Sequence, residues 1–464
     1  MEHGDWRCAR TLLYIFLSLI PTDVHASHIS PDITLQQVLL MKKQHTTNIL
    51  ILGAGIGGFE TFRTLSRLLR RAGSKKVITI VDKNNYFTFV PMMHEVATGS
   101  IEPTHASIPL RELVYNTPHH FQKAEVQHID PKKKCVTTST GTISYTDACV
   151  VALGSRTNYF GTPGAQEHSY HVRTLEGAMR LKRDMLTLLD TSTNPELAIT
   201  VVGGGYTGVE VAGQYTDLIE HEVRKLYPEK HITLRIIEAS TSILATMPQH
   251  IQKRVTQRLE SKGVEILVGD RVMSVTNNSV TLATAGTLHS DITIWTAGFE
   301  TIGARFLDSS INERGRINVS NKLLVENRET LYAIGDIANI VDPNTNISYP
   351  QLAEAAHLEG EYVAHHIVNT LKQKPSKPFV FKSKGQMMPV GDWWGVAQIG
   401  PFTLFGKLAW WIRRTVYVLF MPGFLRKLRI VSDWTIHSFG YRDVINVEYT
   451  EKHSEHIVHR SKKE

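Results

Sequence analysis

Short apolar runs rich in β-branched residues recur along the chain, separated by longer stretches of mixed polarity. One run, Ile49 to Ile51, enters a glycine-rich turn, and the next, Val77 to Val81, follows after an interval long enough for a helix. Runs of this length and composition predict buried strands. Buried strands that alternate with helices predict an α/β fold with a parallel sheet.

The first strand leads into glycines in the G-x-G-x-x-G spacing, at Gly53, Gly55 and Gly58. In this motif the first glycine permits a tight turn, the second lets backbone N–H groups approach a pyrophosphate, and the third lets the following helix pack on the strand. The phosphates then lie at the positive end of that helix. The second strand ends in Asp82, where a carboxylate can accept from ribose hydroxyls. A turn residue at the end of a strand is the alternative interpretation of Asp82.

An internal repeat strengthens this interpretation. Ala198 to Val202 lead into a second motif of the same spacing, at Gly203, Gly205 and Gly208, and Glu238 ends the next apolar run. The two motifs lie about 150 residues apart, and each stands between a predicted strand and a predicted helix. Two nucleotide-binding folds in one chain imply two dinucleotides or a duplicated scaffold.

Further apolar runs end in glycine turns and continue the repeat. Asp147 to Gly154 closes the first half, and Asp291 to Gly298 closes the second. A later run, Thr330 to Gly335, ends in a Gly-Asp turn at Asp336. An aspartate in such a position is also common as a helix N-cap.

Composition narrows the function classes. The chain has 464 residues, enough for two or three domains, and a formal net charge of +7. No zinc-ligand spacing, RNA-recognition motif or basic arm accompanies that charge, so we expect no nucleic-acid partner. Cys8, Cys135 and Cys149 form no C-x-x-C pair, so redox chemistry falls to a bound cofactor. The sequence has no ligand cluster of the required type, and we expect no metal.

The segment after Gly385 is rich in tryptophan and in basic residues. Leu404 to Phe420 is apolar over most of a helical circumference, and a second predicted helix places Phe424, Leu428, Val431 and Trp434 on one face and Arg426, Arg429 and Asp433 on the other. We expect these helices to lie in a membrane interface, with tryptophans at headgroup depth and basic residues on anionic lipid. Packing on the protein's own core or on a dimer partner is the alternative. The interface hypothesis predicts that truncation after Lys384 releases the protein into the soluble fraction with its cofactor still bound.

The N-terminal segment imitates a secretory signal. Arg7 and Arg10 precede an apolar run, Thr11 to Ile20, which is too short to span a bilayer as a helix, and Val24 to Ser27 are small residues. We interpret the segment as an extension that precedes a functional protein beginning near Met41. A signal peptide and a mis-assigned start remain open.

The order of the motifs resembles the two-dinucleotide-binding flavoprotein reductases, and within them the type II NADH:quinone oxidoreductases. Four stretches carry the resemblance beyond the glycine spacing: YFTFVPMMHEVATGSIEP from Tyr86, LGSRTNYFGTPGAQEHSYHVRTLEGAMRL from Leu153, VVGGGYTGVEVAGQY from Val201 and GFLRKLRIVSDWTIHSFGYRDV from Gly423. The resemblance implies FAD on the first fold and NADH on the second. For FAD it implies Gly53, Gly55, Gly58, Asp82, Ala152, Gly154, Gly335 and Asp336. For NADH it implies Gly203, Gly205, Gly208, Glu238, Ala297 and Gly298.

Glu210 matches the family glutamate that lies near nicotinamide and flavin and assists hydride or proton movement; a buried structural carboxylate is the alternative. Glu238 favours NADH, because a carboxylate accepts from ribose hydroxyls and repels a 2′-phosphate.

One segment departs from the family's A-Q-x-A-x-Q quinone motif: Glu354 and Leu358 replace the two glutamines, with His357 between them. Glutamate keeps an acceptor and loses the amide donor, so recognition of a quinone carbonyl would change.

The sequence thus predicts an α/β protein with two Rossmann-like dinucleotide-binding domains and a C-terminal region of amphipathic, membrane-anchoring helices. We expect an N-terminal extension at 1–44, an FAD domain at 45–160 and 299–373, an NADH domain at 161–298, and the membrane-associating region at 374–464.

The expected activity is FAD-dependent oxidation of NADH with electron transfer to a membrane quinone and no proton pumping, at the cytoplasmic face of the inner membrane. The expected protein is peripheral, and a homodimer is left open. The alternatives are a reductase that passes electrons to a protein carrier and a low-turnover redox sensor.

Overall fold

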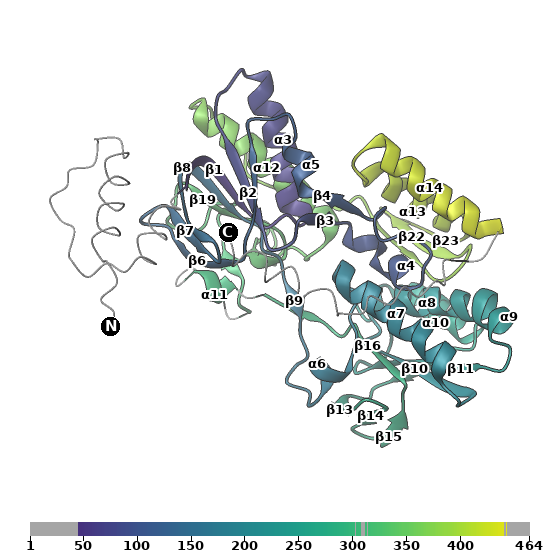
Figure 1. Ribbon diagram of the computed structural model, residues 1–464. Helices are drawn as coiled ribbons and strands as arrows, with labels where there is room; N and C mark the ends of the chain where they lie inside the picture. Colours follow the sequence, from purple (N-terminus) through teal and green to yellow (C-terminus); the bar gives the residue numbers. More distant parts are fainter. Residues whose placement is uncertain (1–44, 302, 308–310, 313, 440–441, 443–464) are drawn as a thin grey trace, which may run out of the picture. The chain divides into compact units, whose positions relative to one another are not determined.

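The computed structural model describes residues 45–301, 303–307, 311–312, 314–439 and 442 (Figure 1). The chain divides at His45, and the described elements that follow belong to one compact unit. The expectations for the N-terminal extension lie outside the described residues.

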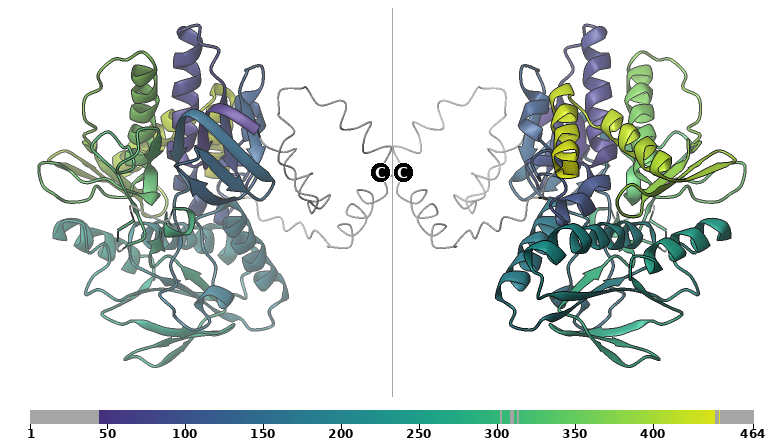
Figure 2. Two further views of the ribbon diagram at one scale, coloured as in Figure 1. Left: turned by 90° about the vertical axis from the view of Figure 1, so that its left-hand side faces the viewer. Right: turned by 90° about the vertical axis from the view of Figure 1, so that its right-hand side faces the viewer.

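The first sheet is mainly parallel and holds the first glycine turn. Its order is β5-β2-β1-β8-β7-β6, and β19 also pairs with β8. Its strands are β1 (His45–Leu52), β2 (Ile78–Asp82), β5 (His120–Lys123), β6 (Val126–Asp130), β7 (Cys135–Thr138), β8 (Gly141–Val151) and β19 (Leu331–Ala333). The pairing of Leu331 with Cys149 brings the chain back to this sheet after the second fold. Helices α3 (Ile56–Arg71) and α12 (Ala353–Leu371) lie side by side against it (Figures 1 and 2).

The second sheet repeats the plan and is parallel throughout. Its order is β12-β11-β10-β16. Its strands are β10 (Glu196–Val202), β11 (His231–Glu238), β12 (Glu265–Val268) and β16 (Ile292–Trp295), and its helices are α7 (Leu175–Thr191), α8 (Tyr206–Leu218) and α10 (Gln249–Glu260). An antiparallel sheet accompanies it, formed by β13 (Val272–Val275), β14 (Ser279–Leu282) and β15 (Thr287–His289). The predicted α/β fold with two strand–glycine turn–helix units is confirmed.

Shorter elements connect these layers. They are β3 (Tyr86–Thr88), a 3-10 turn (Val90–Met92), α4 (Met93–Ala97), β4 (Ser107–Pro109), α5 (Leu110–Val114), β9 (Arg156–Thr157), α6 (Ala165–His168), a π-helical turn (Ile219–Val223), α9 (Arg224–Leu226), β17 (Phe299–Glu300), α11 (Gly303–Phe306), β18 (Ile317–Asn318), a 3-10 turn (Gly335–Ile337) and β20 (Ala338–Asn339). Strand β9 pairs with β17, so the two chain crossings between the sheets run together.

The C-terminal region differs from the prediction in its first part. Residues 386–406 form an antiparallel sheet of β21 (Gln386–Pro389), β22 (Gly395–Ile399) and β23 (Phe402–Gly406), followed by α13 (Lys407–Phe420) and α14 (Phe424–Phe439). The predicted helix from Leu404 therefore starts too early, because Leu404 pairs with Ala397 in the sheet. Within the described residues, no helix is long and apolar enough to cross a membrane.

On α14 one residue of the predicted apolar face, Trp434, departs from the prediction. Phe424, Leu428 and Val431 are exposed, but Trp434 is buried and its Nε1 donates to Glu95 Oε2 at 2.7 Å. On the polar face, Asp433 Oδ2 lies 2.6 Å from His105 Nδ1. The helix therefore turns part of its polar face toward the protein and leaves apolar side chains outside.

Candidate functional site

Both glycine turns are closed by contacts that a side chain would break. A Cβ on Gly53, where φ is +92°, would lie 2.3 Å from the carbonyl oxygen of Ala152, and a Cβ on Gly203, where φ is +104°, would lie 2.7 Å from Ala297. A Cβ on Gly58 would approach the Gly53 carbonyl oxygen to 1.9 Å. Gly208 repeats that contact with Gly203 at the same distance. Positive φ and close packing thus require glycine at these positions.

Gly55 and Gly205 have a different reason to be glycine. They are the N-caps of α3 and α8, with extended backbone at φ −68° and −76°, and an added Cβ would meet nothing within 4 Å. Neither backbone conformation nor protein packing requires a glycine there. The free space lies where N–H groups at a helix N-terminus can receive phosphate oxygens. The two turns therefore fit dinucleotides.

The predicted ribose carboxylates occupy equivalent positions. Asp82 accepts from the backbone N–H groups of Ala54 at 2.7 Å and Asn84 at 2.8 Å. Glu238 accepts from Gly204 and Ser240, each at 2.7 Å. Burial raises the pKa of Asp82, and the N–H groups of Ala54 and Asn84 offset part of that rise. Each carboxylate is fixed against its glycine turn with further lone pairs available to hydroxyl groups.

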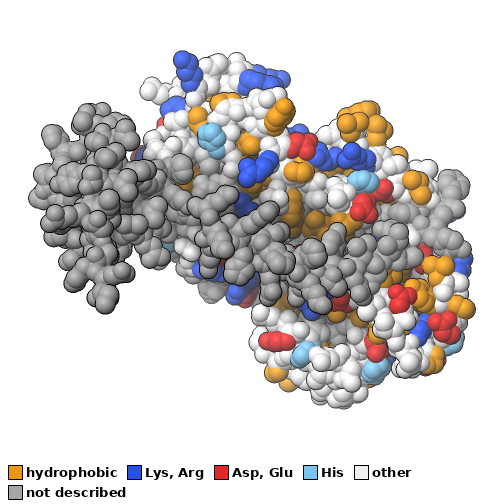
Figure 3. Space-filling view, in the orientation of Figure 1, with side chains coloured by type: hydrophobic (Ala, Val, Ile, Leu, Met, Phe, Trp, Pro, Cys, Tyr) orange, Lys and Arg blue, Asp and Glu red, His pale blue; other side chains and the backbone are white. Residues whose placement is uncertain are grey.

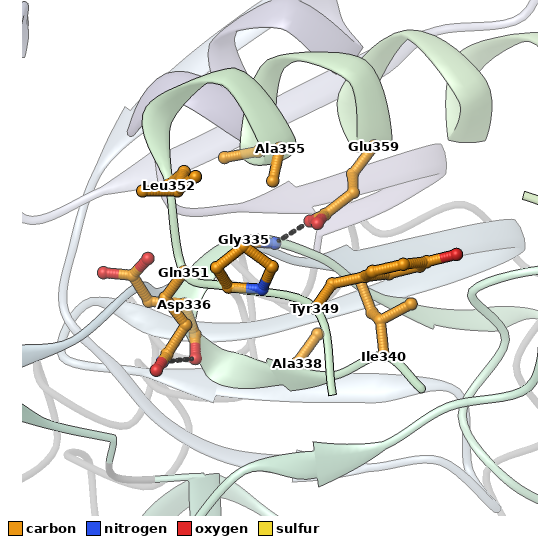
Figure 4. A pocket seen from close by; sticks show the side chains of 11 residues that line it. Gly335, Asp336, Ala338, Ile340, Tyr349, Gln351, Leu352, Ala355 and Glu359 are labelled. Atoms are coloured by element: carbon orange, nitrogen blue, oxygen red, sulfur yellow. Dashed lines mark hydrogen bonds between the residues drawn. The ribbon is translucent and has the colours of Figure 1, made fainter. Parts of the chain in front are cut away.

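The Gly-Asp turn borders a small cavity next to the N-terminus of α12 (Figure 4). Gln351 Nε2 donates to the Asp336 carbonyl oxygen at 2.6 Å, and Arg173 Nη2 lies 3.2 Å from the Asp336 carboxylate. Ser155, one residue after the predicted Gly154, donates to the same carboxylate. The turn after β19 is thereby joined to Ser155, which lies just after the end of β8.

Glu359 lies in the wall of that cavity. Its Oε2 accepts from the Gly335 N–H at 2.6 Å (Figure 4). Burial raises the pKa of Glu359 to about 7; the N–H of Gly335 opposes the rise and Asp336 adds to it. Glu359 was not among the predicted site residues, although it directly follows Leu358, the last residue of the altered motif.

The expected quinone residues do not gather at this cavity. Glu354 accepts from Ser383 Oγ at 3.0 Å and from the Lys384 N–H at 2.9 Å, which anchors the loop before β21. His357 faces α3, with Nδ1 3.5 Å from a Glu60 oxygen, and Leu358 packs against the core. The cavity is instead lined on α12 by Ala355, Ala356 and Glu359.

Glu210 lies where three parts of the chain meet. It stands on α8, its Oε2 is 3.7 Å from His94 Nδ1 on α4, and its Oε1 is 4.0 Å from Arg413 Nη2 on α13. Burial raises the pKa of Glu210 to about 8, Arg413 partly offsets this, and Glu95 adds to it. The neighbours of Glu210 were not among the predicted site residues. The sequence offered one signal for them, the polar pair His94-Glu95 inside an otherwise apolar stretch.

A separate cluster has the geometry of a metal site. Ligand atoms of Asp217, His221 and Asp392 lie within 4.8 Å of one another. Arg442 Nη2 lies 3.8 Å from a carboxylate oxygen of Asp217 and 3.8 Å from one of Asp392. A guanidinium therefore already supplies positive charge to these carboxylates.

The sequence matches a known protein family. Residues 47–360 match the pyridine nucleotide-disulphide oxidoreductase family. The chain belongs to this family. In this oxidoreductase both described cysteines, Cys135 and Cys149, are free.

Individual relatives refine the comparison. The chain is 28% identical over 418 residues to the type II NADH:quinone oxidoreductase Ndh of Mycobacterium tuberculosis, covering 84% of this chain and 87% of that protein. It is 28% identical over 401 residues to the demethylphylloquinone reductase NdbB of Synechocystis, covering 84% and 96%. The structure of NDH2 from Plasmodium falciparum in complex with NADH aligns with a TM-score of 0.77 at 20% identity, covering 86% of this chain and 99% of that one. The predicted resemblance of this oxidoreductase to type II NADH:quinone oxidoreductases is confirmed.

Proposed function

We propose that the protein is an FAD-dependent NADH:quinone oxidoreductase that acts at a membrane surface and pumps no protons. One observation carries the proposal. Each of two glycine turns leaves space at a helix N-terminus and holds a carboxylate, Asp82 or Glu238, through a backbone N–H of the turn. Relatives that align over most of their length are named type II NADH:quinone oxidoreductases.

The residues divide between two dinucleotides. We assign FAD to residues 45–160 and 299–373, where Asp82 would accept from ribose hydroxyls and the Gly335-Asp336 turn would meet the rest of the cofactor. We assign NADH to residues 161–298, where Glu238 would accept from the adenosine ribose and its negative charge would disfavour a 2′-phosphate. FAD, when bound, supplies a two-electron carrier between NADH and the acceptor. The protein's contribution is positioning, exclusion of water and the protonation state of Glu210.

The acceptor site is proposed on the α12 side of this cavity, next to the part that FAD would occupy against the Gly335-Asp336 turn. Glu359 reaches its wall as a carboxyl group whose pKa is raised to about 7 by burial, so near neutral pH it can present either an O–H donor or an acceptor to a quinone oxygen. The replacement of family glutamines by Glu354 and Leu358 leaves this function to Glu359, because Glu354 is already engaged by the loop at 383–384.

The membrane contact is proposed on α13 and α14. Large apolar side chains of these helices are exposed, and they are Leu408, Trp411, Leu419, Phe420, Phe424, Leu425, Leu428, Val431 and Ile436. Figure 3 shows apolar side chains beside lysine and arginine side chains on this part of the surface. An apolar face flanked by basic residues is typical of a helix that lies in an anionic membrane interface. We place the protein peripherally on the cytoplasmic face of the inner membrane.

Vesicle binding tests the membrane contact. Phe424 and Leu425 are 73% and 69% exposed, so replacing both with serine should leave the fold intact and abolish co-sedimentation with anionic liposomes. Ile347→Ser is the matched control, because Ile347 is 68% exposed and lies on neither helix. Undiminished sedimentation of the Phe424/Leu425 variant would place the contact elsewhere.

Anaerobic flavin spectroscopy tests the redox assignment. NADH should bleach the bound flavin, and a quinone added afterwards should restore its absorbance. Bleaching that only a protein carrier reverses would favour the reductase alternative. Flavin that NADH does not bleach would favour the redox sensor.

A further inference from the structure

Three separate segments supply the polar groups around Glu210. His94 comes from α4, Glu210 from α8 and Arg413 from α13. The side chains of His94 and Arg413 are 3% and 2% exposed, whereas that of Glu210 is 14% exposed. The carboxyl of Glu210 is thus the member of the group that retains access to its surroundings.

Arg413 fixes the tautomer of His94. Its Nη2 lies 3.1 Å from His94 Nε2, and a guanidinium offers donors only. Nε2 must therefore accept, and the proton of the neutral ring lies on Nδ1. Burial and the charge of Arg413 lower the pKa of His94 to about 3, so the ring is neutral near neutral pH.

Arg413 is itself held in place. Its Nη1 donates to Glu95 Oε1 at 2.7 Å, and its guanidinium carbon lies 4.4 Å from the ring centroid of Tyr417. The other oxygen of Glu95 accepts from Trp434 at 2.7 Å. The orientation of the His94 ring is therefore determined by contacts from both C-terminal helices.

His94 Nδ1, which carries the proton of the neutral ring, is the ring nitrogen near Glu210. The distance from Nδ1 to Oε2 is 3.7 Å, and contacts of this kind commonly shorten when substrates bind. The other charged or titratable groups that face Glu210 are Glu95 from α4, Tyr206 from its own helix, and Arg413 and Tyr417 from α13. Among these neighbours, Tyr206 donates its hydroxyl to Gln386, whereas His94 is a neutral donor whose tautomer is set by Arg413.

We propose that His94 is a positioning residue for Glu210: its Nδ1–H, directed by Arg413, stabilises the Glu210 carboxylate and sets the pH at which that group gains or loses its proton. The inference rests on the proposed function, since it gives Glu210 a part in turnover. It also gives the C-terminal region a direct connection to the chemistry, through Arg413.

Two amide substitutions separate the nitrogens of His94. The amide of asparagine occupies the Nδ1 position, so His94→Asn keeps a donor toward Glu210. The amide of glutamine occupies the Nε2 position, so His94→Gln keeps an acceptor for Arg413 and loses that donor. His94→Met removes both the donor toward Glu210 and the acceptor for Arg413. It replaces His94→Gln as the variant without the donor if His94→Gln does not retain flavin.

The test is the pH profile of NADH-dependent flavin reduction and of steady-state turnover. The wild type should show an inflection near pH 8 that Glu210→Gln lacks. His94→Gln should move it upward by about one pH unit, and His94→Asn should leave it in place. Arg413→Lys, which keeps a cationic donor, should also leave it in place.

Several outcomes would overturn the inference. If the inflection lies at the same pH in His94→Gln and His94→Asn, the Nδ1–H of His94 does not set that pH. If the wild-type inflection persists in Glu210→Gln, Glu210 is not the group that titrates. Either result leaves NADH-dependent flavin reduction, and so the proposed function, standing. Failure of NADH to reduce the wild-type flavin would contradict the proposed function instead.

Discussion

Nη1 of Arg413 lies 2.7 Å from Oε1 of Glu95, although 318 positions separate the two residues in the chain. Both side chains are buried. Burial raises the pKa of Glu95, but the charges of Arg413, His94 and Arg414 and the hydrogen bond from Arg413 together outweigh it and hold the pKa at about 2. The C-terminal helices are therefore part of the folded core. Truncation after Lys384 would leave Glu95 buried without its cation, so we now expect it to yield a misfolded protein rather than a soluble flavoprotein.

Breaking this pair from one side should destabilise the protein strongly. Arg413→Met or Glu95→Gln alone should each lower the free energy of unfolding by about 3–5 kcal/mol, because each leaves a buried polar partner uncompensated. The double variant should be more stable than Arg413→Met, since no unpaired charge remains. Urea unfolding of the flavin-bound protein measures these differences, and additive losses in the double variant would show that the pair is not coupled.

Gly55 and Gly205, where an added Cβ would meet no protein atom within 4 Å, allow a matched pair of variants. Gly55→Ala should weaken FAD binding about 10- to 100-fold, because its methyl group meets no protein atom and can only crowd the phosphates. Gly205→Ala should retain FAD and raise the KM for NADH by a similar factor. Flavin retention on gel filtration and NADH titrations provide the two readouts. Loss of flavin from Gly205→Ala would contradict the assignment of the two turns.

Glu238 should control the choice between NADH and NADPH. Removing its carboxylate in Glu238→Ser should raise the ratio of kcat/KM for NADPH to that for NADH by about 10- to 100-fold, because the repulsion of a 2′-phosphate is lost. Asp291→Ser, which changes an acidic residue elsewhere in the same domain, is the control. A wild type that prefers NADPH would refute the assignment of Glu238.

Glu359 should make stability depend on pH. Its pKa is about 7 in the folded protein and has an ordinary value of 4.5, so the folded state binds the proton more tightly. This stabilisation is complete below pH 4.5 and is lost as the pH rises through 7. Glu359→Gln cannot ionise and keeps an acceptor for Gly335, so its stability relative to the wild type, measured by thermal unfolding, should rise between pH 4.5 and about 7. Parallel curves for the two proteins would mean that Glu359 does not titrate in this range.

Local features of the chain were predictable because neighbouring residues determine them. The strands before Gly53 and Gly203, and the carboxylates at Asp82 and Glu238, follow from runs and spacings within a few dozen positions. The orientation of α14 was not predictable in this way. Its apolar stripe includes Trp434, but a buried acceptor on Glu95, more than 300 positions away, turns that side chain inward.

The same limit applies at the acceptor site. Matching to the family motif drew attention to Glu354, whereas its carboxylate anchors the loop at Ser383, which lies 29 positions later. Glu359, on the cavity side of the same helix, is recognised only when the Gly335 turn is placed against α12. The strands at 386–406 were interpreted as part of a helical region because the composition of the whole stretch after Gly385 was considered together. Their antiparallel pairing depends on contacts between segments.

The measurement that tests the central claim most directly is NADH oxidation by the detergent-purified, FAD-loaded protein, with a ubiquinone analogue, with a menaquinone analogue and without quinone. The account predicts rapid oxidation that depends on quinone and that Glu359→Leu reduces, since this change removes the polar group from the cavity wall. NADH-reduced flavin that no quinone reoxidises faster than the quinone-free control would contradict it.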